Sequence, residues 1–295
     1  MEVQNLDNNT VRALVDAGIH FGHRVGRWNP KMKPYIFCSR NAIHIINIKE
    51  TIKGIARARK FLTNVVASNK DVLFVGTKRQ AKTPITEQAA RTGMPYVAER
   101  WLGGTLTNFG TIRKRLGRLE ELEALDESGQ MAAQGKKMES MLRREYRKIK
   151  RNLEGIRNMD RMPGALVIID ACREHLAISE AVKFGIPTVC LLDTDSNPDI
   201  VDIPIPGNDD AMRGIEIILT QIGDAVMEGK AGRVDIKGDG EQRKGRSRRA
   251  SLSQEAAAPA PAPVAAAAAA AGAATEVAPA PAETTEAPAP ENQGE

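Results

Sequence analysis

Three short, continuously apolar runs constrain the fold of this chain most strongly. They are "DVLFVGT" (71–77), "ALVIID" (165–170) and "TVCLLD" (188–193). None of them alternates polar and apolar residues, and such continuity is typical of strands that are buried on both faces of a parallel sheet. The segments between them place apolar residues at helical spacing. We therefore predict an α/β fold whose mostly parallel sheet is covered by helices on both faces.

The remaining elements of this core follow from the same spacing rules. Helices are predicted at 8–18, 48–68, 78–93, 173–185 and about 208–228, and a further strand at 41–48. Thr10 is the expected N-cap of the first helix and Gly18 its end. Before the last helix, Pro204 and Pro206 interrupt a short apolar segment, which is therefore expected at the edge of the sheet.

Residues 106–156 interrupt this pattern and are predicted to be an inserted pair of helices. Apolar residues at helical spacing stop in "DESGQMAAQG" (126–135) and then resume, as in two antiparallel helices joined by a loop. The second helix is strongly basic. A charged helix face is usually only solvated, but the excess of bases here favours binding. The candidate contacts on this helix are Arg143, Arg144, Arg147, Lys150 and Arg151.

The chain thus divides into a globular α/β core (1–105 and 157–230), the inserted hairpin (106–156) and two C-terminal parts. Residues 231–250 are a basic linker rich in Gly, Ser, Lys and Arg. Residues 251–295 are mostly Ala and Pro and contain almost no large apolar side chain. Such a segment cannot bury enough surface to offset its ordering entropy, so we predict a disordered tail.

The charge of the chain is unevenly distributed. The formal net charge is +5, but the tail has six Glu and no Lys or Arg, so residues 1–250 carry 42 bases against 31 acids. This balance suggests nucleic acid, or less often an anionic membrane, as the partner; a merely basic soluble protein is the alternative. No apolar run reaches the ~18 residues of a membrane-spanning helix. The N-terminus lacks a signal-peptide pattern, and three widely spaced cysteines suit a reducing cytoplasm.

The segment from Ala17 to Lys49 contains six Lys or Arg and no acid. Its Gly and Pro residues predict a shaped surface loop, a common place for binding residues. The candidate contacts to phosphate are Arg24, Arg27, Lys31 and Lys33. Trp28 either stacks on an unpaired base or packs against Pro30 and Pro34.

A second candidate loop is "ERWLGGTLTNFGTIRKR" (99–115). Gly103 and Gly104 would let its backbone come close to a partner. Its candidate contacts are Arg100, Arg113, Lys114 and Arg115. Trp101 is alternatively the hydrophobic anchor of the hairpin.

The predicted strand ends leave an enzymatic interpretation open. Parallel sheets bind ligands at the carboxyl ends of their strands, and these ends read "FVGTKRQA", "IIDACREH" and "LLDTDSNPD". The first fails as a Walker motif, because Asp71 stands where that motif needs glycine. A nucleotide-dependent enzyme that uses Lys78, Asp170 and Asp193 is the rival interpretation. A protein-interaction adaptor with the hairpin as its docking arm is a third.

Metal sites are a further alternative. His20 and His23 stand three residues apart and could reach one metal ion, and Asp193 with Asp195 could hold Mg²⁺. The resemblance of the second pair to a calcium loop fails, because that loop would need glycine at Pro198. No Ser-His-Asp or Cys-His arrangement can be argued from the spacing. We predict no catalytic residue, no metal and no cofactor.

Five motifs stand in one order along the chain: "HFGHRVGRWNPKMKPYIF", "FVGTKRQA", "RWLGGTLTNF", "MPGALVIID" and "IPIPGNDDA". In this the chain resembles the bacterial small-subunit ribosomal protein S-two family (universal uS-two family) from about residue 3 to residue 230. The second motif contains Lys78 and Arg79, which become candidate RNA contacts. Local departures are Ala171-Cys172, where the family usually has Pro, and Asp195, where it often has Asn. They weaken any ligand role for those strand ends.

The resemblance implies a Rossmann-like, flavodoxin-like α/β core with a protruding coiled-coil hairpin. It also implies a structural, non-catalytic protein of the cytoplasmic ribosome. Its expected partners are the small-subunit rRNA and neighbouring ribosomal proteins, including the large ribosomal protein S-one, which it would help to attach. No membrane partner is expected. The linker and tail lie outside the shared core, so the resemblance implies nothing about their role.

Overall fold

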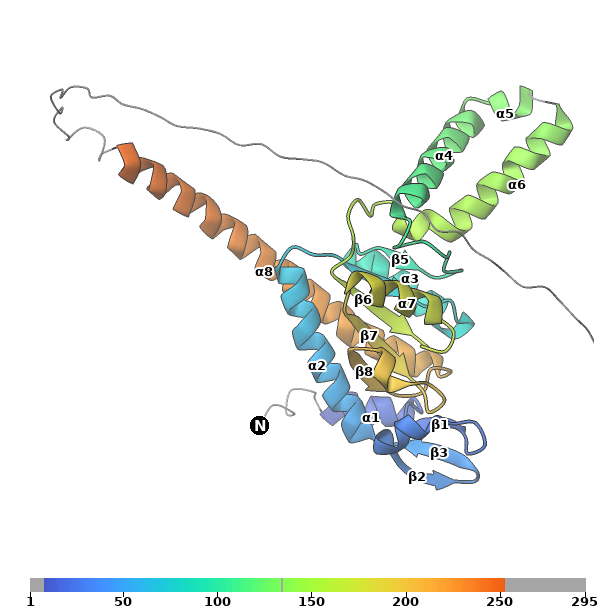
Figure 1. The fold of residues 1–295 in the computed structure, drawn as a ribbon, viewed down its shortest axis with the longest axis vertical. Coiled ribbons are helices and arrows are strands. Elements are labelled where there is room, and N and C mark those ends of the chain that lie inside the picture. The colour runs from blue at the N-terminus through green and yellow to red at the C-terminus, as the bar shows by residue number, and fades with distance from the viewer. Residues whose placement is uncertain (1–7, 134, 253–295) are drawn as a thin grey trace, which may run out of the picture. The chain divides into compact units, whose positions relative to one another are not determined.

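A computed structural model describes residues 8–133 and 135–252 (Figure 1). Its central sheet has five parallel strands in the order β5-β4-β6-β7-β8. They are β4 (Val72–Val75), β5 (Tyr96–Val97), β6 (Ala165–Ile169), β7 (Thr188–Leu192) and β8 (Ile203–Pro206). Every residue of β4, β6 and β7 is buried, as their continuous apolar sequences predict. β8 is the edge strand expected from its two prolines. The α/β class is therefore confirmed.

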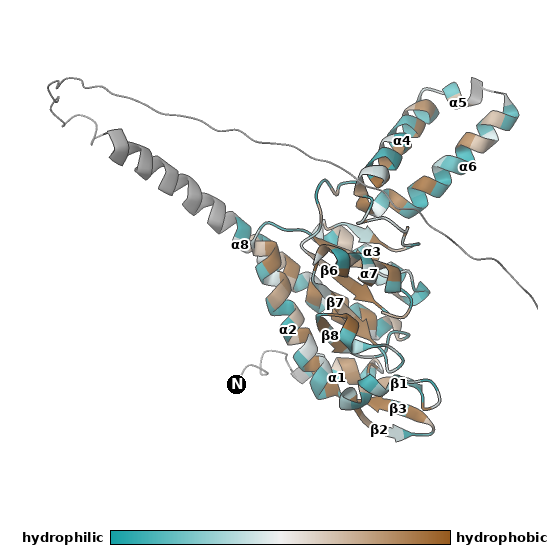
Figure 2. Cartoon of the chain, viewed as in Figure 1, coloured by the Kyte–Doolittle hydropathy of each residue, from teal (hydrophilic) through white to brown (hydrophobic). Residues whose placement is uncertain are grey.

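Alternate residues of these strands point into two apolar layers. Val72 and Phe74 pack with the helices of one face, whereas Leu73 and Val75 pack into the layer on the other. The first layer includes α1 (Asn8–Asp16), α2 (Ile48–Ala67), α3 (Arg79–Thr92) and α8 (Met212–Leu252), and the second includes α7 (His175–Phe184) and the base of the hairpin. Figure 2 shows the strands as hydrophobic and the outer helix faces as mixed. No helix within the described residues is long and apolar enough to cross a membrane.

The ends of the predicted helices are mostly confirmed. Gly93 and Gly185 end α3 and α7 in the left-handed conformation, at φ 60° and 62°. The prediction for Thr10 is wrong, because α1 begins at Asn8 and Thr10 lies inside it. The last helix begins at Met212 rather than Asn208, since the Asn208 side chain accepts a hydrogen bond from the Asp210 N–H and forms a turn there.

The C-terminal predictions are only partly covered by the structure. α8 continues to Leu252, through the residues predicted as a basic linker. Residues 253–295, which make up almost all of the predicted tail, lie outside the described residues. Their expected disorder remains a prediction.

The N-terminal segment forms a small antiparallel sheet, which corrects its prediction as a loop. β1 (Phe21–Arg24), β2 (Ile36–Arg40) and β3 (Ile43–Ile46) stand in the order β1-β3-β2, and the 3₁₀ helix η1 (Pro30–Tyr35) precedes β2. Asn41 and Ala42 link β2 to β3 with φ of 51° and 58°, as a two-residue hairpin turn requires. The strand predicted at 41–48 is thus present, but it does not join the parallel sheet.

The insertion contains two helices in contact with each other, as the apolar spacing predicts, whereas a coiled-coil geometry stays a prediction. α4 (Phe109–Glu127) and α6 (Lys136–Leu153) lie side by side (Figure 1), and the predicted break holds the short helix α5 (Gln130–Ala133). Leu122, Met131 and Leu142 form a small core between the arms. At the base, residues of both arms join the apolar layer of the sheet, and the 3₁₀ helix η2 (Glu154–Ile156) follows α6. The described part of the hairpin therefore has a separate small core toward its tip and shares the core of the sheet at its base.

Candidate nucleic-acid interface

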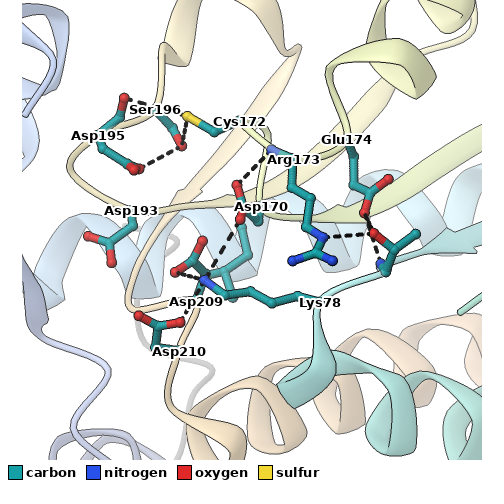
Figure 3. Close-up of polar contacts among 12 residues, drawn as sticks. Lys78, Asp170, Cys172, Arg173, Glu174, Asp193, Asp195, Ser196, Asp209 and Asp210 are labelled. Carbon is teal, nitrogen blue, oxygen red and sulfur yellow. Dashed lines mark hydrogen bonds and ion pairs between the residues drawn. The ribbon is translucent and has the colours of Figure 1, made fainter. Parts of the chain in front are cut away.

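The carboxyl ends of the parallel strands bring polar side chains together (Figure 3). Thr77 and Lys78 follow β4, Asp170 follows β6, Asp193 follows β7, and Asp209 lies just beyond β8. Parallel strands place these ends at one edge of the sheet, where α/β proteins commonly bind ligands. Whether these strand ends could bind a nucleotide, as the enzymatic interpretation requires, therefore depends on whether these side chains are free or paired with one another.

Lys78 occupies the centre of this strand-end cluster. Its Nζ lies 2.7 Å from a carboxylate oxygen of Asp209, 2.7 Å from one of Asp210 and 3.7 Å from one of Asp170. Burial lowers the pKa of Lys78, but the hydrogen bonds to Asp209 and Asp210 outweigh it and raise that pKa overall. For the acid Asp209, burial has the opposite effect and raises the pKa. The negative charges of Asp170 and Asp193 raise it further, whereas Lys78 lowers it. With 13% of its side chain exposed, Lys78 neutralises neighbouring acids rather than facing a solvent phosphate.

The neighbouring groups of this edge are also paired. Glu174 accepts hydrogen bonds from the Thr77 N–H at 2.8 Å and the Thr77 hydroxyl at 2.5 Å. Arg173 donates from Nε to the Thr77 hydroxyl at 3.0 Å and from its backbone N–H to Asp170 at 3.1 Å. Burial raises the pKa of Glu174 although the bonds from Thr77 oppose it. The cluster is a closed polar network, which leaves its charged groups engaged with one another.

His23 joins the small sheet to the end of β7. Its Nδ1 lies 2.9 Å from Asp193 Oδ2, and its Nε2 lies 3.6 Å from Asp195 Oδ2. The hydrogen bond to Asp193 raises the pKa of His23 to about 9, against the effect of burial. His20 does not converge on this pair, since its ring stacks on Phe21 with centroids 4.2 Å apart. Among the residues that the structure describes, no three or more His, Cys, Asp or Glu are arranged to hold a metal ion.

The candidate contacts of the N-terminal segment fall into two groups. Arg27 lies 3.5 Å from Asp195 and Lys31 lies 2.5 Å from Asp199, although both basic side chains are more than half exposed. Arg24 and Lys33 are exposed on β1 and η1. Trp28 is 36% exposed, and its ring packs on His44 with centroids 5.2 Å apart. One face of Trp28 is therefore engaged, by a residue that the sequence did not suggest.

The loop that precedes the hairpin is fixed from inside. Trp101 is 5% exposed and belongs to the apolar layer beneath the hairpin, which confirms it as an anchor. Gly104 has a φ of 93°, so its glycine serves a turn of the chain. Arg100 points to solvent. Sequence reasoning missed Glu180, on α7, which hydrogen-bonds to this loop across 73 to 79 positions of the chain; no local signal marks such a partner.

The hairpin exposes most of its predicted basic contacts. On α6, Leu142 and Leu153 are buried and Tyr146 and Ile149 partly buried, so the residues between them face solvent. Arg143 pairs with Glu139 at 2.9 Å, and Lys150 donates to the Tyr146 hydroxyl at 2.8 Å. On α4, Arg113 pairs with Asp160 at 2.6 Å.

Nine of the predicted contacts are exposed and form no ion pair within the described residues. They are Arg24, Lys33, Arg79, Arg100, Lys114, Arg115, Arg144, Arg147 and Arg151. They come from the small sheet, the start of α3, the loop before the hairpin and both of its arms. This is the unneutralised positive charge that a polyanion would meet.

We predict that Lys78→Met lowers the free energy of unfolding by about 3 kcal/mol, because it leaves buried carboxylates without their cation. The loss of stability should be smaller at acidic pH, because protonation of Asp209 removes its repulsion with Asp170 and Asp193. Urea unfolding at two pH values measures it. Lys82→Met is the matched control: its pair with Glu99 is about one-third exposed on each side and should contribute less than about 1 kcal/mol. Equal effects of the two variants would contradict a buried network.

His23 should make stability depend on pH in the alkaline range. Its folded pKa of about 9 lies above the ordinary 6.5, so its contribution is complete below pH 6.5 and is lost as pH rises through 9. A shift of this size corresponds to about 3 kcal/mol. Because the His23 ring is 22% exposed and partly screened by solvent, we expect the free energy of unfolding to fall by about 1–2 kcal/mol over this range. His23→Gln should abolish that fall, whereas the exposed His175→Gln should keep it. Parallel pH profiles for His23→Gln and the unsubstituted protein would refute the assignment.

Comparison with known proteins gives a consistent family. The family model described as "Ribosomal protein S2" matches residues 14–229. The small ribosomal subunit protein uS2 of Rhodopirellula baltica is 55% identical over 223 residues, which cover 76% of this chain and 86% of that protein. The protein of the same name in Acidothermus cellulolyticus is 53% identical over 221 residues (75% and 80%), and that of Synechocystis 49% over 229 residues (78% and 85%). The chain therefore belongs to the ribosomal protein S2 family, whose members are structural, non-enzymatic proteins of the small ribosomal subunit.

Proposed function

We propose that this protein holds its place in the small ribosomal subunit by binding rRNA phosphates through its exposed Lys and Arg side chains. The observation that carries the proposal is the set of nine exposed basic side chains without an ion pair in the described part of the chain. Neutralising phosphates releases their counterions, which favours binding. Such contacts fix position and orientation and carry little sequence information. This suits a structural protein.

The remaining candidate contacts differ in how easily they become available. Five are held in ion pairs whose basic side chains are 41–76% exposed: Arg27, Lys31, Arg113, Arg143 and Lys150. Exposed pairs contribute only about 0–1 kcal/mol, so a phosphate can replace the acid at little cost. Lys78 is different, because its buried acids would be left without a cation. We therefore leave Lys78 out of the proposed interface. The exposed edge of Trp28 can still stack on a base.

The hairpin gives the sharpest test of RNA binding. We predict that combined Arg144→Ala, Arg147→Ala and Arg151→Ala reduces the slope of log affinity against log salt by about 2, because roughly 0.7–0.9 counterion is released per phosphate contact. Filter binding to purified small-subunit rRNA at several salt concentrations measures the slope. Lys53→Ala, Arg57→Ala and Lys183→Ala remove the same charge elsewhere and should change it less. An unchanged slope in the first variant would remove α6 from the interface.

We infer further that the small sheet contacts other ribosomal proteins and helps to attach the large ribosomal protein S-one. Phe37 lies on the edge strand β2 and is 74% exposed. Free sheet edges and exposed aromatic side chains favour association with a partner. Arg24 and Arg40 are exposed on the same small sheet, and such positive charge suits an acidic partner segment. The exposure of Phe37 on an open edge is what supports a protein contact at this sheet.

The attachment of S-one can be tested at Phe37. We predict that Phe37→Ser lowers the amount of S-one per small subunit while the amount of this protein stays constant, because only the apolar contact is lost. Quantitative mass spectrometry of purified subunits gives both ratios. Phe184→Ser alters a 51% exposed phenylalanine on α7 and should change neither. Full S-one occupancy in the Phe37 variant would exclude this edge as its docking site.

A further inference from the structure

A single carboxylate gathers the loop at the entrance to the hairpin. Glu180 Oε1 accepts hydrogen bonds from Trp101 Nε1–H at 3.1 Å and from the Gly104 N–H at 2.8 Å. Its Oε2 accepts from the N–H groups of Leu106 at 2.9 Å and Thr107 at 3.0 Å, and from the Thr107 hydroxyl at 3.2 Å. All five donors belong to a seven-residue segment, Trp101 to Thr107. The segment is thus held by a single side chain of α7.

Glu180 is a buried charge that the loop itself compensates. The residue is 6% exposed, and it forms no ion pair with Lys or Arg within the described residues. Burial acts to raise its pKa, but the hydrogen bonds from Thr107, Gly104, Leu106 and Trp101 outweigh burial and lower it. Bonds from N–H groups to an ionised carboxylate are stronger than neutral ones. Removing the carboxylate would leave several inward-facing donors without an acceptor.

The two arms of the hairpin are joined to the sheet in different ways. The outgoing arm packs directly on it: Gly155, just after α6, lies so close to the backbone of Tyr96 in β5 that a Cβ would not fit. The entering arm α4 begins at Phe109, immediately after the loop that Glu180 holds. That loop turns through Gly104, whose carbonyl accepts a hydrogen bond from the Asn108 N–H at 2.8 Å. Ile112 and Leu116 of α4 also pack in the apolar layer of the sheet. The start of α4 is therefore placed by that burial together with what holds residues 101–107.

We propose that Glu180 is a positioning residue that sets the orientation of the hairpin relative to the sheet, so that basic side chains of the hairpin and of the core meet one RNA surface together. The use made of this orientation rests on the RNA-binding function proposed above. Arg100 immediately precedes the held segment, and Arg113 to Arg115 lie in the first turns of α4. A rotation at the loop would displace these side chains, and those of α6, away from the contacts made by the small sheet.

The orientation can be measured without RNA. In full-length protein carrying Cys38→Ser and Cys172→Ser, spin labels at Ser68→Cys on the core and Ser128→Cys at the hairpin tip report one distance; Cys190 is buried and stays unlabelled. Glu180→Ala should broaden the distance distribution, and added acetate should narrow it again by replacing the missing carboxylate. Amide exchange at Gly104, Leu106 and Thr107 should accelerate about tenfold or more, as each loses a charge-assisted bond.

The control is Glu174→Ala, which removes another buried glutamate of the same region, bonded to Thr77 rather than to the loop. It should leave the label distance unchanged. If Glu180→Ala does not fold, the isosteric Glu180→Gln carries the test, because its amide puts a donor against the donors of the loop. A distribution as narrow as that of the unsubstituted protein, or one that Glu174→Ala broadens equally, would overturn the positioning role.

RNA affinity then separates this inference from the function on which it rests. We expect Glu180→Ala to weaken binding to small-subunit rRNA about tenfold, within the usual range for coupled sites, and acetate to restore it. Failure of the unsubstituted protein to bind RNA would refute the proposed function, while the label distances would still decide the orientation. Unchanged affinity in a variant whose hairpin is measurably loosened would overturn the link between Glu180 and binding.

Discussion

The five parallel strands of the sheet pair with one another and offer apolar side chains on both faces, so every other part of the protein must accommodate two surfaces that avoid water. Burying a large aliphatic or aromatic side chain contributes about 1.5–3 kcal/mol, which makes covering each face the dominant requirement. The helices α1, α2, α3 and α8 cover one face. The other is covered by α7 and by the base of the inserted hairpin. The hairpin is therefore part of the core at one end, which explains how a projecting element can be held at a defined place.

Parallel pairing also decides what happens at the strand ends. It collects Thr77, Asp170, Asp193 and Asp209 at one edge, the place where an α/β enzyme would hold its ligand. Here the ammonium group of Lys78 lies among the acids, and Glu174 satisfies the Thr77 backbone. The geometry that forms active sites in other α/β proteins here forms ion pairs and hydrogen bonds that connect the strand ends to one another. This is consistent with the non-enzymatic character of the family.

Two carboxylates thus have related tasks in different places. Asp193 receives His23 and ties the small sheet to the core, and Glu180 receives the loop that leads into the hairpin. Both are buried and both are compensated by groups from distant segments. Most of the basic side chains proposed to meet RNA lie on the small sheet, or on the hairpin and the loop before it, which these carboxylates fasten; Arg79 lies on α3. Charge is therefore used inside the protein to orient elements and on its surface to meet a partner.

The apolar runs and the helical spacing were enough to predict the α/β class, the buried strands and the hairpin, because burial and periodicity are local properties of the chain. The small antiparallel sheet was not predicted. Its strand β1 is only four residues long and contains a glycine, so no local pattern marks it, and it is stabilised by pairing with β3. The sequence left two roles for Trp101, a contact to a partner or the hydrophobic anchor of the hairpin. Its burial in the structure decided for the anchor.

The sequence by itself also determined the excess of positive charge and the segments that carry it. Which of those charges are available was decided by the tertiary structure. Lys78 follows a strand as a phosphate-binding lysine would, yet Asp209, 131 positions away, lies 2.7 Å from its ammonium group. The strength of an ionic interaction depends on separation in space and on burial, and the fold sets both by joining residues that the chain keeps far apart.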